Sequence, residues 1–245
     1  MQFEIFRKYA DEVRHGLSVR VGGVSSGPYE SMNLGLVGDE QKNIEENYRR
    51  FGAEVGFDVQ KLCIPYQEHT DKVAVISEGV GLGNPFEGID GFITAEKGVP
   101  IGVRFADCQG VLMYEPERKV IAAVHSGWRG NVQNMIGKTV GRMVKEFDCD
   151  AEKNLVGVSQ SLGPCCAEFS DPATELPEFM QQYVDEKKHV DLWTCSLDQL
   201  REAGVLEENV EMTRRCTKCE NDVFFSCRAA EGGPFGHMAG VIELT

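Results

Sequence analysis

Apolar residues gather in the middle of the chain in two long segments, residues 101–114 and 119–130. Both segments are rich in Val and Ile, and the short polar sequence Glu115–Arg118, which contains a proline, separates them. Apolar runs bounded by turn residues are typical of strands. The pattern therefore predicts a β-hairpin with its tight turn at these four residues.

The predicted hairpin brings together two reactive residues. If the turn is centred on Pro116 and Glu117, Cys108 and His125 are directly opposed and their side chains lie on one face. Opposed residues have Cα atoms about 4.5–5.5 Å apart, so a thiolate and an imidazole there can share a metal or a proton. The prediction depends on register, because a one-residue bulge would move Cys108 to the other face.

Periodicity predicts helices elsewhere. Residues 130–147 carry apolar side chains at steps of three and four, and residues 39–51 interleave Glu with Lys and Arg before Gly52. A third helix is expected over residues 196–203, with Ser196 as its N-cap and the following glycine as its stop.

Short apolar runs predict further strands, at residues 91–94, 155–158, 223–226 and 237–244. Helices and strands do not alternate strictly. The chain therefore indicates an α/β fold of the α+β type, with mixed β-sheets flanked by helices, rather than a doubly wound nucleotide fold. No linker or repeat divides the sequence, so residues 1–245 are expected to form a single domain.

Charge and hydropathy exclude several classes of partner. The net charge is −14 and no stripe of Lys and Arg is visible, which argues against nucleic acid. No apolar run reaches the roughly 18–20 residues of a membrane span. The first residues lack the basic and apolar regions of a signal peptide, so a cytoplasmic location is expected.

Nine cysteines are many for such a chain, and their number is odd. Without a secretory context most are expected to be reduced and buried. Cys216 and Cys219 have the C-x-x-C spacing of a zinc or redox pair, but no second pair follows and Cys227 is a poor partner. Cys165 is expected to be a buried structural thiol.

Cys108 and His125 are compatible with either a metal site or a Cys–His nucleophilic pair. His69, in the polar segment Gln67–Thr70, is the natural third member. Two histidines, one thiolate and an open position would make a catalytic zinc site, and the same ligands also suit copper.

Three residues are candidates for binding the substrate or its phosphate. Arg129 is expected at a strand-to-helix junction, where backbone N–H groups and a guanidinium favour phosphate. Arg20 precedes a glycine pair, and Asp107 precedes Cys108. Arg104 is a further candidate, expected to be structural.

These residues lie in segments that resemble the laccase-domain purine nucleoside phosphorylases, a family also known as polyphenol oxidases or multicopper-oxidase-like proteins. The resemblance runs nearly from end to end. Its matching segments are Arg20–Tyr29, Ser31–Gly35, Gln67–His69, Ala106–Cys108, Ala123–Gly130, Gly163–Cys165, 191–205, Cys216–Thr217, Phe224–Ser226 and Met238–Ala239.

The resemblance implies a single-domain fold similar to that of the deamidating cysteine–histidine toxins. It also implies a metal site formed by His69, Cys108 and His125, with zinc as the usual metal and copper as the alternative. The implied activity is phosphorolysis of adenosine, inosine and S-methyl-5'-thioadenosine, with some adenosine deaminase activity. The expected partners are thus purine nucleosides and phosphate.

Four positions depart from the family pattern. Thr70 replaces a usual Gly, Gly110 a usual Pro, and Cys227 and His237 a common Tyr and Arg. The three metal-ligand positions are intact. The departures bear on substrate preference, because such positions can line a substrate pocket.

Other functions remain open. A metal-free Cys–His hydrolase or amidase would use Cys108 as nucleophile and His125 as base, and some relatives are linked to editing of peptidoglycan precursors. A mononuclear copper phenol oxidase is a further alternative. True multicopper chemistry needs more ligands than five histidines supply. A closed four-ligand shell would instead indicate a structural metal in an interaction protein.

Overall fold

The hairpin expected from the sequence is present, but its register differs. The computed structural model describes residues 1–83 and 86–245. Strand β5 (Gln109–Glu115) pairs with β6 (Val120–Ser126), and Gly110, not Cys108, lies opposite His125. The predicted direct pairing was therefore wrong by two residues. Because side chains alternate with a period of two, a shift of two residues keeps Cys108 and His125 on the same face.

The first arm of the hairpin is not one strand. It consists of β4 (Ile101–Phe105) and β5, which belong to different sheets. The chain bends at Ala106–Cys108, and Asp107 has a φ of 82°. The bend explains why polar side chains interrupt an otherwise apolar run.

The strands form two sheets among the described residues. A three-stranded sheet has the order β1-β9-β4, and a six-stranded sheet the order β2-β3-β6-β5-β7-β8. The remaining strands are β1 (Val13–Leu17), β2 (Val73–Val75), β3 (Gly91–Thr94), β7 (Leu155–Val158), β8 (Val210–Met212) and β9 (Met238–Leu244).

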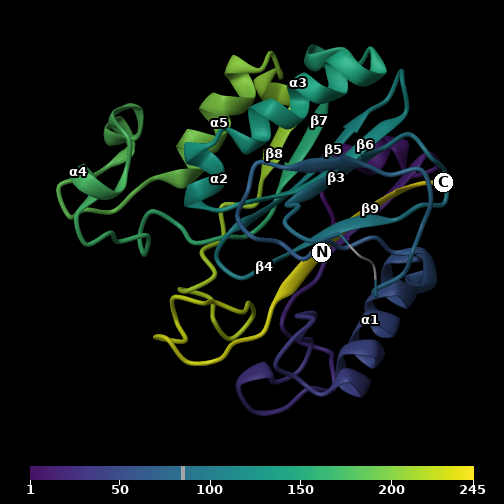
Figure 1. The fold of residues 1–245 in the computed structure, drawn as a ribbon, viewed down its shortest axis with the longest axis horizontal. Coiled ribbons are helices and arrows are strands. Elements are labelled where there is room, and N and C mark those ends of the chain that lie inside the picture. The colour runs from purple at the N-terminus through teal and green to yellow at the C-terminus, as the bar shows by residue number, and fades with distance from the viewer. Residues whose placement is uncertain (84–85) are drawn as a thin grey trace.

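Alternation along the strands builds a layered core. Leu112 and Tyr114 of β5 face β4 and β9, so one apolar cluster fills the space between the two sheets. Val111 and Met113, on the opposite face of β5, pack against α3 and α5. The outer face of the smaller sheet packs on α1. Figure 1 shows α3 and α5 on one side of the sheets and α1 on the other.

The predicted helices are present with corrected ends. The long segment expected as one helix breaks at Gln133 and Asn134, and Asn134 adopts a φ of 56° while its side chain caps the second helix. Ser196 is buried inside a helix whose N-cap is Asp191. The helices are α1 (Gln41–Val55), α2 (Trp128–Val132), α3 (Met135–Phe147), α4 (Pro172–Glu175) and α5 (Leu192–Glu202).

Helix α1 runs through Gly52 and ends at Val55, and the next residue, Gly56, is its left-handed C-cap with a φ of 95°. The expected strands at residues 91–94, 155–158 and 237–244 are confirmed to within a residue. The expected strand at residues 223–226 was wrong, because those residues follow an irregular path with no strand pairing.

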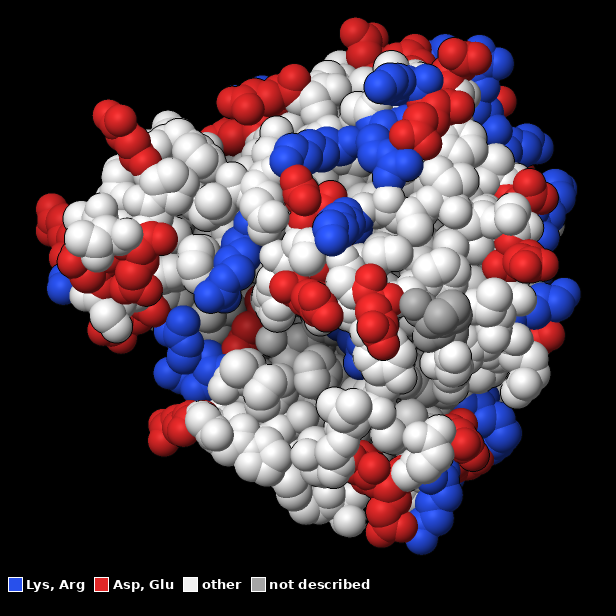
Figure 2. Space-filling model, in the orientation of Figure 1, with Lys and Arg blue, Asp and Glu red and all other residues white. Residues whose placement is uncertain are grey.

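The mixed α/β fold with two sheets and flanking helices is thus confirmed. None of the helices in residues 1–83 and 86–245 is long and apolar enough to cross a membrane. On the face drawn in Figure 2, Lys and Arg are interspersed with Asp and Glu.

Candidate functional site

The three residues expected to bind a metal come together from three separate segments. His69 lies in a loop, Cys108 at the bend before β5, and His125 in β6, and their ligand atoms all lie within 4.8 Å of one another. His69 Nε2 is 3.8 Å from Cys108 Sγ, and the two imidazole rings meet edge to face with centroids 4.9 Å apart. The site therefore forms even though the predicted pairing was wrong.

Gly127 makes room for the Cys108 sulfur. In the observed register Gly127 stands where the hairpin partner of Cys108 would be, and a Cβ atom added there would lie 2.4 Å from Cys108 Sγ. The backbone of Gly127 has φ −93° and ψ −164°, which any residue adopts. The glycine is thus required for space and not for backbone conformation.

We expect Gly127→Ala to displace the Cys108 sulfur and weaken metal binding at this site by about 5–150-fold, because overpacking a tight site costs about 1–3 kcal/mol and each 1.4 kcal/mol is a factor of ten. Gly141→Ala is the matched control, since a Cβ there meets nothing within 4 Å and Gly141 is exposed in α3. Competition with a chromogenic chelator measures the affinity. Equal affinities for the two variants would contradict the steric role of Gly127.

Asp90 holds both histidines and was not identified from the sequence. It is fully buried, and its carboxylate accepts a hydrogen bond from His125 Nδ1 at 2.8 Å. It also accepts bonds from the backbone N–H groups of Glu68, His69 and Thr70 at 2.7–3.1 Å. A single buried acid therefore orients one imidazole and shapes the loop that carries the other.

The bond to Asp90 fixes the tautomer that His125 adopts in its neutral form, the form that binds a metal. With Nδ1–H donated to the carboxylate, Nε2 is left to face Cys108 and His69. Metal-binding histidines commonly donate their second nitrogen to a carboxylate in this way. Burial alone would raise the pKa of Asp90, but the bonds from His125 and Thr70 hold it below its usual value.

Cys108 and His125 form a charged pair without a metal. Burial opposes charge on the Cys108 thiol, but the His125 imidazolium and hydrogen bonds from both histidines lower the pKa of Cys108 to about 6. Burial also opposes charge on His125, yet the Cys108 thiolate and Asp90 raise the pKa of His125 to about 9. The thiolate is the form that binds metals and attacks carbonyl carbons.

Two departures from the family pattern have a physical role. The hydroxyl of Thr70 donates to Asp90 at 2.9 Å, which adds a bond that Gly at this position would lack. The backbone N–H of Gly110 donates to Ser159 Oγ at 2.8 Å, and a proline there could not donate. A Cβ at Gly110 would also lie 2.5 Å from the Phe105 ring.

The cluster opens into a cavity of about 550 Å³. This volume lies within the usual range of about 300–1,000 Å³ for small-molecule sites. Aromatic rings of Tyr66, Phe105, Trp128, Phe169 and Phe235 stand among its walls. Trp128 meets Phe169 edge to face with centroids 5.9 Å apart. The cavity therefore offers flat apolar walls beside a group of polar ligands.

The two arginines expected to bind phosphate do not line the cavity, but two other arginines do. Arg129 is exposed and stacks over its neighbour Trp128, and Arg20 donates to Asn221 O, so neither lines the cavity. Arg104 and Arg228 do line it. Arg104 Nη2 donates to Pro65 O, while its buried Nε has no partner among the described residues.

Asp107 and two of the departing positions also lie at the cavity. Asp107 accepts bonds from Thr217 Oγ1 and the backbone N–H of Arg228, both at 2.6 Å, so it braces the wall. Cys227 and His237 line the cavity. Burial, with Arg104 nearby, lowers the pKa of His237 to about 4, which leaves it neutral near pH 7.

A family model described as multi-copper polyphenol oxidoreductase laccase matches residues 14–245. The chain belongs to this family. It is 30% identical to mouse purine nucleoside phosphorylase LACC1, over 96% of this chain and 56% of that protein, so it spans only about half of that relative. It is 29% identical to a purine nucleoside phosphorylase of Bacteroides thetaiotaomicron, over 92% of this chain and 89% of the other.

The fold is shared with a protein of known structure. The crystal structure of YlmD from Geobacillus stearothermophilus superposes with a TM-score of 0.86 at 27% identity, over 95% of this chain and 92% of the other. Because the superposition covers nearly the whole chain, the likeness is one of the entire two-sheet fold and not of a local motif.

Proposed function

We propose that this protein is a metal-dependent purine nucleoside phosphorylase acting on adenosine, inosine and S-methyl-5'-thioadenosine, with adenosine deaminase side activity. The observation that carries the proposal is the group of His69, Cys108 and His125 at an aromatic-walled cavity of nucleoside size. The names of the relatives support the substrate class, since purine nucleoside phosphorylases and one adenosine deaminase are among them.

The donor set fits a catalytic metal. His69, Cys108 and His125 would hold a zinc ion, with copper as the alternative, and three protein ligands leave an open position. A bound metal of this kind supplies Lewis-acid polarisation of a substrate or water oxygen. Asp90 keeps the His125 Nε2 lone pair directed at the cluster, and its buried bond to Nδ1 also holds the ring in place.

Arg104 and Arg228 are the residues we propose for phosphate. Both line the same cavity as the metal-ligand group, and a guanidinium fork matches phosphate oxygens. His237, neutral near pH 7, adds a hydrogen-bond donor or acceptor to the same cavity. The aromatic walls would stack on the base. The two arginines would supply the local positive charge that an anionic phosphate needs in a protein with a net charge of −14.

The products from adenosine test the proposal. The full chain, loaded with zinc, is incubated with adenosine in the presence and absence of phosphate, and the products are separated. We expect adenine and ribose 1-phosphate only when phosphate is present, with a smaller yield of inosine. Inosine as the sole product would make the protein a deaminase, and no turnover of any nucleoside would refute the proposal.

A metal-free Cys–His hydrolase is the second candidate, favoured by the lowered pKa of Cys108 beside His125. Under this alternative a chelator leaves activity intact and iodoacetamide abolishes it. Under the first proposal a chelator abolishes activity, and bound metal protects Cys108 from alkylation. Peptide mapping of the alkylated residue, before and after chelation, separates the two.

A further inference from the structure

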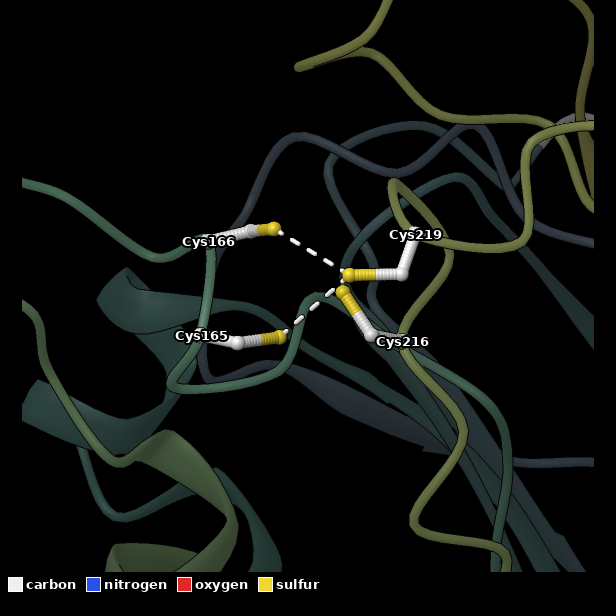
Figure 3. A group of neighbouring side chains, drawn as sticks. All are labelled: Cys165, Cys166, Cys216 and Cys219. Carbon is white, nitrogen blue, oxygen red and sulfur yellow. Dashed lines mark hydrogen bonds between the residues drawn. The ribbon is translucent and has the colours of Figure 1, made fainter.

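A second group of cysteines lies outside the site described above. Cys165 and Cys166 are adjacent in the chain, and Cys216 and Cys219 come from a segment about fifty residues later, yet all four sulfurs lie within 4.8 Å of one another. Figure 3 shows the four side chains pointing toward a common centre. Cys219 Sγ lies 3.5 Å from the sulfurs of both Cys165 and Cys166.

We propose that Cys165, Cys166, Cys216 and Cys219 bind one zinc ion in a closed tetrathiolate shell that fixes one wall of the cavity. Zinc–sulfur bonds of about 2.3 Å in a tetrahedron place the sulfurs about 3.8 Å apart. The observed separations of 3.5 Å and up to 4.8 Å bracket this value. They are far longer than a disulfide bond of about 2.05 Å.

The backbone around the cluster holds the two segments in register without the metal. Ser161 donates its N–H to Arg215 O at 3.2 Å, and Thr217 donates its N–H back to Ser161 O at 3.1 Å. The N–H of Gly163 points at Cys216 Sγ at 3.3 Å, as backbone amides do at thiolate ligands. Ligand positions fixed in advance in this way favour binding.

The segment that carries Cys216 and Cys219 has little regular structure of its own to hold it in place. Residues 213–237, all described, contain no helix or strand between β8 and β9. Irregular loops longer than about 12–15 residues are uncommon in compact domains. In Figure 1 this part of the chain forms the yellow loops at one end of the molecule. A structural zinc site contributes folding free energy directly and would hold such an irregular segment in place.

The cluster is connected to the cavity through short contacts. Thr217, between the two later cysteines, donates to Asp107, which is next to Cys108. Arg228 donates to the carbonyl of Cys166 at 3.2 Å, and Leu162 and Ala167, on either side of the cysteine pair, line the cavity. A closed zinc site here would be structural, unlike the open three-ligand group, and it does not depend on the proposed nucleoside chemistry.

Metal counts on variants test the inference. The full chain is produced in zinc-supplemented medium, and zinc per chain is measured by elemental analysis. We expect two equivalents in the wild type, one in Cys108→Ala, one in Cys219→Ser, and two in Cys227→Ser, the matched control for an exposed cysteine outside the cluster. We also expect faster amide hydrogen exchange at residues 161–169 and 213–230 in Cys219→Ser.

X-ray absorption spectroscopy of the Cys108→Ala variant identifies the atoms that bind zinc at the four-cysteine cluster, even if Cys219→Ser does not fold. This variant keeps all four cysteines of the cluster, and we expect four sulfur neighbours at about 2.3 Å from zinc. The inference is overturned by Cys108→Ala protein without metal, by iron in place of zinc, by nitrogen or oxygen in the shell, or by a disulfide within the cluster. None of these results depends on whether nucleosides are turned over.

Discussion

Replacing Cys108 with alanine is expected to remove one metal equivalent and to lower kcat/KM for adenosine phosphorolysis by about 10³-fold or more. The sulfur is one of only three ligand atoms that the described residues bring together at the cavity, within 4.8 Å of one another. Metal catalysis supplies several kcal/mol of transition-state stabilisation, and each 1.4 kcal/mol is a factor of ten in rate.

The measurement combines elemental analysis with steady-state kinetics at saturating phosphate. The fold should survive, because Cys108 is only half-buried and the core strands do not depend on it. Cys227→Ala, a truncation at another cysteine of the cavity, is expected to keep its full metal content. Unchanged metal content in Cys108→Ala would rule out the sulfur as a ligand, and unchanged kcat/KM would show that the metal does not act in the reaction.

The sequence predicted the three clustered residues but not how they meet. Residue types and apolar runs located the hairpin, while the exact register depended on where the turn was centred. The observed pairing of Gly110 with His125 differs by two residues, which preserves the face. A shift of one residue would have separated Cys108 from His125. The predicted proximity of Cys108 and His125 therefore depended on the shift in register being an even number of residues.

Contacts between distant segments were not predictable from spacing. Asp90 precedes a short buried strand and lies far in sequence from the histidines it binds, so its only signal was an acid at the start of an apolar run. The partners of Cys216 and Cys219 were missed for the same reason. A metal-ligand search by local spacing finds one pair and cannot find the adjacent cysteines about fifty residues before it.

The arginines were misplaced because their positions depend on tertiary packing. Arg129 does begin a helix beside the site, as the sequence predicted, but its side chain stacks on Trp128 at the surface. Arg104, a further candidate in the sequence, is expected to be structural, yet it lines the cavity. Its strand, β4, belongs to the three-stranded sheet and is separated from β5 by the bend at residues 106–108, which apolar patterning alone does not predict.

Asp90→Asn is expected to lower both stability and metal affinity, although it preserves the volume of the side chain. The amide replaces one acceptor oxygen with a donor, and in either orientation that donor faces an N–H group of the loop or of His125. An unmatched polar group at a fully buried position costs about 3 kcal/mol, which lowers the melting temperature by about 6–12 °C in a chain of this size.

Loss of the carboxylate also frees the His125 ring, so we expect zinc affinity at the His69, Cys108 and His125 group to fall about 10–100-fold. Calorimetry and chelator competition measure the two effects. Asp58→Asn is the matched control, because Asp58 is an exposed helix cap whose role Asn fills equally well. The four-cysteine cluster provides an internal reference within Asp90→Asn itself, since its zinc should be retained. Equal loss at both sites would point to general unfolding, and no loss at the histidines would show that Asp90 does not orient them.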